Sequence, residues 1–271
     1  MKSPRIKLSH EVPLAVLSVS KTFNDYDYCL PHLLDKEYDY FAYFEEAKKE
    51  GRYIIMDNSL HELGHAYDTD RLLHWVNYFK PNEFIVPDVW QDMEGSINNA
   101  AEWAHIELPK ETLKVAVVQA TCIEDTAECY MKYKALGYKK IAFSYGAGYY
   151  KEHFNHPNPA ISTAMGRVNV IGTLYKAEVI EDGDRVHLLG CAVPQEFIHY
   201  KDMKFIETID TSNPIMAAME GTLYTNQGLD EKPITKIDHV MNRPVEMIDW
   251  VKIHTNVNKF REINQLQTIL N

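Results

Sequence analysis

The sequence is short of cationic residues, of cysteine and of long uninterrupted apolar stretches. Lys and Arg together number 28 against 39 Asp and Glu, which leaves a formal net charge of −11 at pH 7. Nonspecific affinity for nucleic acids comes from Lys and Arg that neutralise phosphates, so this balance argues against broad electrostatic capture of a polyanion. A local basic face stays open, and its best candidates for phosphate contacts are Arg167, Lys151, Lys139 and Lys140.

Cysteine is scarce, and its spacing indicates no metal or disulfide framework. The four residues, Cys29, Cys122, Cys129 and Cys191, contain no CxxC pair. Cys122 and Cys129 fall at the start and middle of an expected helix, where small packed thiols are the favoured interpretation. No secretory signal or membrane-length apolar span is visible, so we expect a reduced, cytoplasmic protein, in the host cytoplasm if the gene is viral, without a membrane partner.

What is present indicates an ordinary globular chain. It has 271 residues, of which 45% are hydrophobic and 25% charged, enough for one α/β barrel or two small domains. No low-complexity tract or Pro/Gly/Ser linker divides it. We therefore expect a single domain over residues 1–271, with closing helices around Met247–Lys252 and Asn258–Leu270.

Apolar β-rich runs alternate with stretches of helical periodicity. The expected strands are Leu14–Ser20, Tyr53–Asp57, Glu83–Asp88, Lys114–Gln119, Lys140–Tyr145, Val186–Gly190, Phe205–Asp210 and, more weakly, Ile234–His239. The expected helices are Tyr38–Glu50, Thr69–Phe79, Met93–His105, Glu124–Leu136, Ser162–Tyr175 and Pro194–Tyr200. This alternation is typical of βαβ units with a parallel sheet, and about eight units predict an α/β fold of the (β/α)8 TIM type.

Several expected strands end in polar residues: Asp57, Asp88, Gln119 and Asp210. A carboxylate after a buried apolar run is costly unless it faces a solvated, hydrogen-bonding site, and the carboxyl ends of parallel strands form such sites. Any one Asp is as well explained as a helix N-cap. Three at corresponding strand ends favour a shared site.

These residue types suit nucleotide chemistry. Of two opposed carboxylates, one can attack or stabilise a cationic sugar carbon while the other handles the proton of the departing group. Asp88 or Gln119 could contact the edge of a purine-like base. The Gly146 and Gly190 turns allow close backbone approach to a flat ligand.

A series of short motifs carries a family resemblance. They are Ile55-Met56-Asp57-Asn58-Ser59, Val86-Pro87-Asp88, Val117-Val118-Gln119-Ala120, Ser144-Tyr145-Gly146, His187-Leu188-Leu189-Gly190 with Pro194, and Ile209-Asp210-Thr211-Ser212-Asn213-Pro214. In this order they resemble the queuine tRNA-ribosyltransferase (tRNA-guanine transglycosylase) superfamily. The closest likeness is to its short, often phage-encoded members that insert 7-deazaguanines into DNA.

The resemblance implies a role for each matching residue. Asp210, four residues before Pro214, would be the nucleophile, and Asp57 would be the general acid/base. Asp88 would recognise the base, with Gln119, Gly146, Gly190 and Ser59 as further substrate-binding residues. The implied reaction is the exchange of guanine in a nucleic acid for a 7-deazaguanine, through a covalent Asp–sugar intermediate and without a cofactor.

Two departures from the family pattern bear on the substrate. Asn58-Ser59-Leu60 replaces a small glycine-rich turn and Ala120 replaces a glycine, so the dimensions of the base pocket differ. The tRNA enzymes carry a zinc site of three cysteines and a histidine after the nucleophile, but no cysteine follows Cys191 here. The absence of that zinc-binding subdomain favours DNA over tRNA and leaves a free nucleoside open.

One motif competes with this interpretation. His61-Glu62-Leu63-Gly64-His65 matches HExxH, in which two histidines one helical turn apart bind zinc and the glutamate serves as general base of a peptidase. Its position directly after a strong strand argues against a zinc-peptidase helix. Two further alternatives are a nucleoside or base hydrolase on the same barrel, and a barrel that binds its ligand without turnover.

Overall fold

The computed structural model describes residues 6–264, and all strand pairs recorded within this range are parallel. The strands are β1 (Lys7–Ser9), β2 (Asp27–Cys29), β3 (Ile54–Met56), β4 (Glu83–Ile85), β5 (Leu113–Val118), β6 (Lys140–Ser144), β7 (Val186–Leu189) and β8 (Ile206–Asp210). They form an eight-stranded sheet in the order β1-β8-β7-β6-β5-β4-β3-β2. With a helical segment after almost every strand, this confirms the predicted α/β fold of the (β/α)8 TIM type.

The helices follow the strands in chain order. The α-helices are α1 (Leu14–Ser20), α2 (Pro31–Lys36), α3 (Tyr38–Lys49), α4 (Leu60–Leu63), α5 (Thr69–Phe79), α6 (Met93–His105), α7 (Ile123–Ala135), α8 (Pro159–Lys176), α9 (Asn213–Met219) and α10 (Trp250–Ile263). The 3-10 segments are η1 (Gly148–Glu152), η2 (Pro194–Tyr200), η3 (Ile237–His239) and η4 (Val245–Met247). Side-chain caps fix several helix starts, such as the carboxylates of Asp68 and Asp92, which accept backbone N–H groups of α5 and α6.

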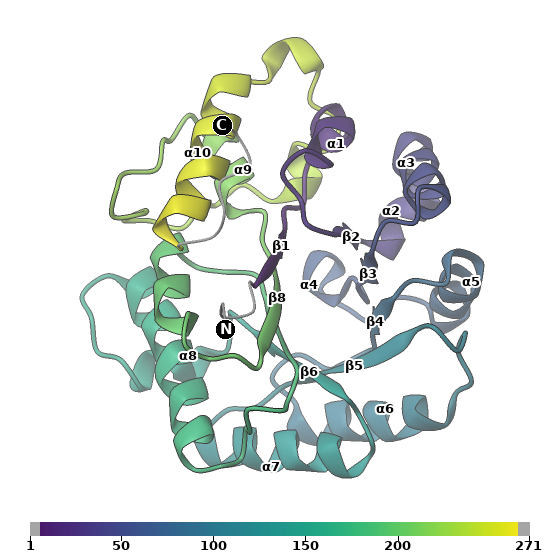
Figure 1. Ribbon diagram of the computed structural model, residues 1–271, viewed down its shortest axis with the longest axis vertical. Helices are drawn as coiled ribbons and strands as arrows, with labels where there is room; N and C mark the ends of the chain where they lie inside the picture. Colours follow the sequence, from purple (N-terminus) through teal and green to yellow (C-terminus); the bar gives the residue numbers. More distant parts are fainter. Residues whose placement is uncertain (1–5, 265–271) are drawn as a thin grey trace. The chain divides into compact units, whose positions relative to one another are not determined.

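The chain divides into two compact units. The first contains residues 1–25, 145–183 and 188–271, and the second contains residues 26–144 and 184–187. In the second unit, α6 and α7 lie side by side along β5 (Figure 1). In the first unit, α9 packs against α10 (Figure 1), and α8 packs against η1 and η2.

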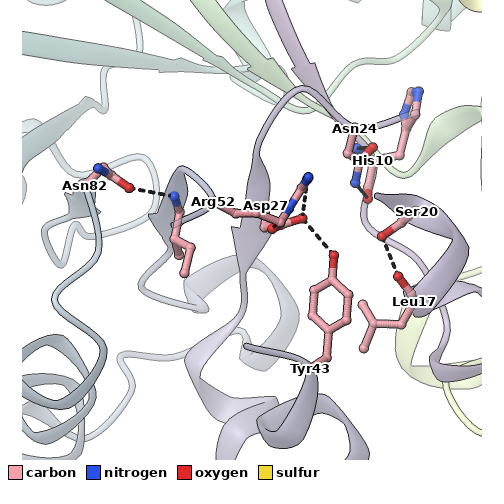
Figure 2. Close-up of polar contacts among 9 residues, drawn as sticks. His10, Leu17, Ser20, Asn24, Asp27, Tyr43, Arg52 and Asn82 are labelled. Carbon is pink, nitrogen blue, oxygen red and sulfur yellow. Dashed lines mark hydrogen bonds and ion pairs between the residues drawn. The ribbon is translucent and has the colours of Figure 1, made fainter. Parts of the chain in front are cut away.

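The amino-terminal end of β2 is fixed by a buried polar cluster within the second unit. Asp27, which begins the strand, accepts a hydrogen bond from the hydroxyl of Tyr43 at 2.8 Å and pairs with Arg52 (Figure 2). One strand further along, the backbone N–H of Ile54 donates to the side chain of Asn82 at 2.8 Å. These contacts anchor β2 and β3 at the ends opposite to the residues that carry the candidate chemistry.

Two of the predicted strands are wrong. Leu14–Ser20 is helix α1, in which Val16, Leu17 and Ser20 are buried, a spacing that belongs to one helical face. Ile234–His239 forms only the 3-10 turn η3, and Ile234 is 90% exposed. The first two strands along the chain are instead β1 and β2. Each has three residues, which is too short for a periodic pattern.

The other predicted elements lie close to the observed ones. Helices Thr69–Phe79 and Met93–His105 match in both bounds, whereas Pro194–Tyr200 is a 3-10 helix rather than an α-helix. The expected closing helix Asn258–Leu270 corresponds to the second half of α10 up to Ile263, and its last six residues lie outside the described residues. None of the helices within residues 6–264 combines the length and the apolar character needed to cross a bilayer.

Candidate functional site

Asp57 directly follows β3 and is held in place by hydrogen bonds within the second unit. Its backbone N–H donates to the carbonyl of Cys29 at 2.9 Å, which continues the β2–β3 ladder by one residue. Its Oδ1 accepts from the hydroxyl of Tyr28 at 2.9 Å, and its Oδ2 accepts from the backbone N–H of Ser59 at 2.9 Å. The carboxyl group is therefore oriented at both oxygens.

The environment of Asp57 favours proton exchange. Burial raises its pKa above the ordinary value, although the bonds from Tyr28 and from the backbone of Ser59 and Asn58 oppose that shift. A carboxyl group whose pKa is raised by burial holds a proton more readily than a solvated one. This direction of shift is the one that a general acid/base requires.

Asp88 lies three residues beyond β4 and accepts hydrogen bonds from two side-chain amides. The Nδ2 of Asn58 donates to its Oδ1 at 2.7 Å, and the Nε2 of Gln119 donates to its Oδ2 at 2.6 Å. Gln119 directly follows β5, so three consecutive strands of the second unit each supply one member of this cluster. All three side chains are buried.

Backbone groups decide which way the two amides point. The Oδ1 of Asn58 accepts the N–H of Leu60 at 2.9 Å, and its Nδ2 also donates to the carbonyl of Val86 at 3.0 Å. The Oε1 of Gln119 accepts the N–H of Gln91 at 3.0 Å. Because each amide oxygen already takes a backbone donor, each amide nitrogen must face Asp88.

The pKa of Asp88 is raised to about 6. Burial is the main cause, and the negative charge of Asp57 adds to it, while the hydrogen bonds from Gln119 and Asn58 act in the opposite direction. A carboxylate offers about four acceptor positions, of which the two amides use two. Asp88 can therefore accept further N–H donors from a ligand.

Ser59, one of the predicted substrate-binding residues, is fully buried and has left-handed backbone geometry with φ of 60°. Its Oγ lies 2.8 Å from the Nδ1 of His32. Its hydroxyl is thus engaged inside the protein, and the contribution visible here is the backbone N–H that orients Asp57.

Tyr28 is a site residue that the sequence analysis missed. It lies in β2, where its hydroxyl donates to Asp57 and its ring stacks on His187 of β7, with 6.0 Å between centroids and 8° between planes. The two tyrosines of the short run of residues 26–30, which Pro31 ends, were the available signal for a strand.

Asp210, the predicted nucleophile, is the last residue of β8 in the first unit. It pairs in register with Ser9 of β1, is 4% exposed, and its Oδ2 accepts the backbone N–H of Gly190 at 3.3 Å. The following residues are also fixed: the hydroxyl of Thr211 accepts the N–H of Asn213 at 3.0 Å, at the start of α9. The Asp210 carboxyl group is thus buried and held by a backbone donor at the end of its strand.

His10 supports the backbone next to Asp210. It follows β1, and its Nδ1 donates to the carbonyl of Thr211 at 2.9 Å. The side chain of Asn24 accepts the backbone N–H of His10 and donates to its carbonyl (Figure 2). Burial lowers the pKa of His10 to about 3, so the imidazole is neutral at pH 7.

The two predicted glycines lie in the first unit. Gly190 directly follows β7 with a left-handed φ of 61°, and a Cβ there would lie 2.5 Å from the ring of Tyr145. No other residue fits without displacing that ring. Gly146 is half-buried in the segment between β6 and η1.

Two of the four residues predicted as phosphate contacts are wrong. Arg167 and Lys140 are completely buried and form ion pairs with Glu196 and Glu83. A basic side chain in that environment has its charge paired inside the protein and does not present it to a polyanion.

The HExxH segment does not form a zinc-peptidase helix. Helix α4 covers only Leu60–Leu63 and ends at Gly64, whose φ of 71° is left-handed, and both His61 and His65 are exposed. The two histidines are therefore not one turn apart on a continuous helix. Within the part of the chain that the structure describes, no group of three or more His, Cys, Asp or Glu side chains could hold a metal ion.

The geometry thus combines, in the second unit, a buried carboxyl group with a raised pKa (Asp57) and a buried carboxyl group that accepts two amide donors (Asp88), and in the first unit a buried strand-end carboxyl group (Asp210). In comparisons with known proteins, no protein-family model matches the chain, and no curated protein matches it.

Proposed function

We propose that this protein is a base-exchange transglycosylase that replaces guanine in a nucleic acid, with DNA as the favoured polymer, by a 7-deazaguanine. The observation that supports it best is the cluster of Asp88, Asn58 and Gln119 beside Asp57. The choice of 7-deazaguanine and of DNA rests on the resemblance of the motifs and on the missing cysteines.

The Asp88 cluster suits a guanine-type base. The Watson–Crick edge of guanine presents two adjacent N–H donors, at N1 and at the exocyclic amine, and a carboxylate accepts such a pair with both oxygens. Asn58 and Gln119 hold that carboxylate from the sides, which fixes its plane before a ligand arrives. Such preorganisation lowers the entropic cost of binding.

In the first step of the proposed reaction, which takes the pairing of Asp210 with Asp57 from the resemblance of the motifs, an Oδ of Asp210 attacks C1′ of the nucleotide. The C1′–N bond breaks, its electron pair goes to the departing guanine, and the proton that guanine needs comes from Asp57. The product is a covalent sugar ester of Asp210 and free guanine.

In the second step, the incoming 7-deazaguanine gives its N9 proton to the Asp57 carboxylate, and N9 attacks C1′. The ester bond breaks and its electrons return to Asp210. Asp57 regains the proton it lost, so neither carboxyl group is consumed. The raised pKa of Asp57 fits this alternation.

The test is incubation with guanine-containing DNA, tRNA and guanosine in separate reactions, each with a panel of 7-deazaguanines. Mass spectrometry of the digested products would detect exchange, and denaturing mass spectrometry of the protein would detect the sugar ester. We expect Asp210→Ala to abolish both and Asp57→Ala to reduce exchange by about 100-fold or more.

Asp68→Asn is the matched control, since Asp68 is an exposed helix N-cap at which Asn caps equally well. Full exchange activity in Asp210→Ala would contradict the assignment of Asp210 as the nucleophile. Release of guanine without incorporation of a 7-deazaguanine would show that the reaction is hydrolysis and not exchange. Absence of any product from all three substrates would refute the proposal.

A further inference from the structure

Arg167 is a buried cation whose placement the proposed chemistry does not yet explain. It projects from α8, is completely buried, and pairs through Nε with the Oε1 of Glu196 at 2.6 Å. The hydroxyl of Tyr200 donates to the same oxygen at 2.8 Å. Burial of the guanidinium lowers its pKa, but the nearby Glu196 carboxylate holds that pKa above the ordinary value, so the group is permanently charged.

The two remaining nitrogens of Arg167 both hold the end of β7. Nη1 donates to the carbonyl of Leu189 at 2.9 Å, and Nη2 donates to the carbonyl of Gly190 at 2.8 Å. The Leu189 carbonyl also accepts the N–H of Tyr145 at 3.0 Å. The strand end is thus fixed by a planar fork with two donors, a geometry that a lysine cannot reproduce.

The Leu189 carbonyl and the Gly190 N–H belong to one peptide unit, and that unit is planar and rigid. Arg167 holds the oxygen of this unit, and its opposite side, the Gly190 N–H, donates to the Oδ2 of Asp210. A cation at the carbonyl oxygen also withdraws electrons from the amide and strengthens its N–H as a donor.

We infer that Arg167 is a positioning residue for Asp210, acting through the Leu189–Gly190 peptide; as a contribution to catalysis, this inference rests on the proposed function. It sets both the direction and the strength of the hydrogen bond that holds the Asp210 carboxylate. Apolar replacement of a buried ion pair is often neutral or stabilising, so stability alone does not account for this pair.

The test uses the full chain with 13C-carbonyl leucine and 15N-glycine. This labelling selects the three Leu–Gly peptide bonds of the sequence, Leu63–Gly64, Leu136–Gly137 and Leu189–Gly190. The Gly190 signal is assigned as the one that changes in Asp210→Asn. In the wild type it should shift with pH across the range in which carboxyl groups titrate, because its N–H follows the ionisation of Asp210.

The principal variant is Arg167→Met/Glu196→Gln, which removes both buried charges at similar volume and leaves Tyr200 an acceptor. Arg167→Lys, which keeps the charge without the fork, is the second variant. We expect the pH-dependent shift of the Gly190 signal to fall at least about threefold in the double variant and to be only partly restored by Lys. The other two signals serve as internal references for folding.

A Gly190 signal that keeps its wild-type pH response in the double variant would overturn the inference. In the exchange assay, the rate of ester formation should fall about tenfold or more, with the acid limb of its pH profile moved to higher pH and the KM for the free base unchanged. If the wild type forms no ester at all, the proposed function fails, while the Gly190 signal still decides whether Arg167 acts on Asp210.

Discussion

The hydroxyl of Tyr28 donates a hydrogen bond to the Oδ1 of Asp57 across 2.9 Å, from one strand of the second unit to the end of the next. Burial raises the pKa of Asp57 and this bond restrains the rise. The proton affinity of the candidate acid/base is therefore set by a balance between desolvation and the hydrogen bonds from Tyr28 and from the backbone of Ser59 and Asn58.

Removing the hydroxyl of Tyr28 should raise the pKa of Asp57. In Tyr28→Phe the ionised form of Asp57 loses a donor, so the pKa of Asp57 should rise further. The measurement is a 13C NMR titration of labelled aspartate carboxyl groups, with Asp57 assigned from Asp57→Asn.

Tyr43→Phe is the matched control, because its hydroxyl donates to Asp27 at 2.8 Å within the same unit. It should leave the Asp57 titration unchanged. An Asp57 signal that titrates identically in Tyr28→Phe and the wild type would contradict the role given to Tyr28.

Asp88 should make the stability of the protein depend on pH. Its pKa is raised from 3.8 to about 6 in the folded protein, so between these values the folded state holds a proton that the unfolded chain has released. Protonated Asp88 therefore contributes about 3 kcal/mol to the free energy of unfolding below pH 4. This contribution is lost as the pH rises through about 6.

Urea unfolding of Asp88→Asn and of the wild type at several pH values tests this effect. The free energy of unfolding of the variant, relative to the wild type, should increase by about 2–3 kcal/mol between pH 4 and pH 7. Asp92→Asn, at an exposed helix N-cap, is the control and should follow the wild type. A constant difference for Asp88→Asn would show that Asp88 is not protonated over this range.

Two glycines of α8 should respond in opposite ways to alanine. A Cβ on Gly166 would lie 1.9 Å from the backbone carbonyl oxygen of Tyr150 in η1, whereas a Cβ on Gly172 meets only Met203 at 3.7 Å. Gly166→Ala should cost more than about 2 kcal/mol of unfolding free energy through overpacking. Gly172→Ala should stabilise by up to about 1 kcal/mol. Equal effects would mean that α8 and η1 are not packed this closely.

The two histidines of the HExxH motif should not bind zinc. Since α4 ends at Gly64, we expect the double variant His61→Ala/His65→Ala to have the same zinc content, the same melting temperature and the same exchange activity as the wild type. Elemental analysis before and after treatment with a chelator checks the first point. One zinc ion per chain that disappears in the double variant would restore the peptidase alternative.

The sequence by itself determined the elements with strong local signals. Thr69–Phe79 and Met93–His105 have helical periodicity behind an Asp cap, and β5 contains the apolar run of residues 115–118, so neighbouring residues alone specify them. The same local logic located Asp57, Asp88, Gln119 and Asp210, because a polar residue directly after a buried run is conspicuous in the sequence.

Only the tertiary structure decided the partners of these residues. Tyr28 lies 29 positions from Asp57 and sits in a three-residue strand with no periodic signal. In the sequence Arg167 resembles an ordinary surface cation, yet it is completely buried and bonded to a carboxylate 29 positions away and to the carbonyls of Leu189 and Gly190. Hydrogen bonds and desolvation depend on distance in space, and the sequence records only distance along the chain.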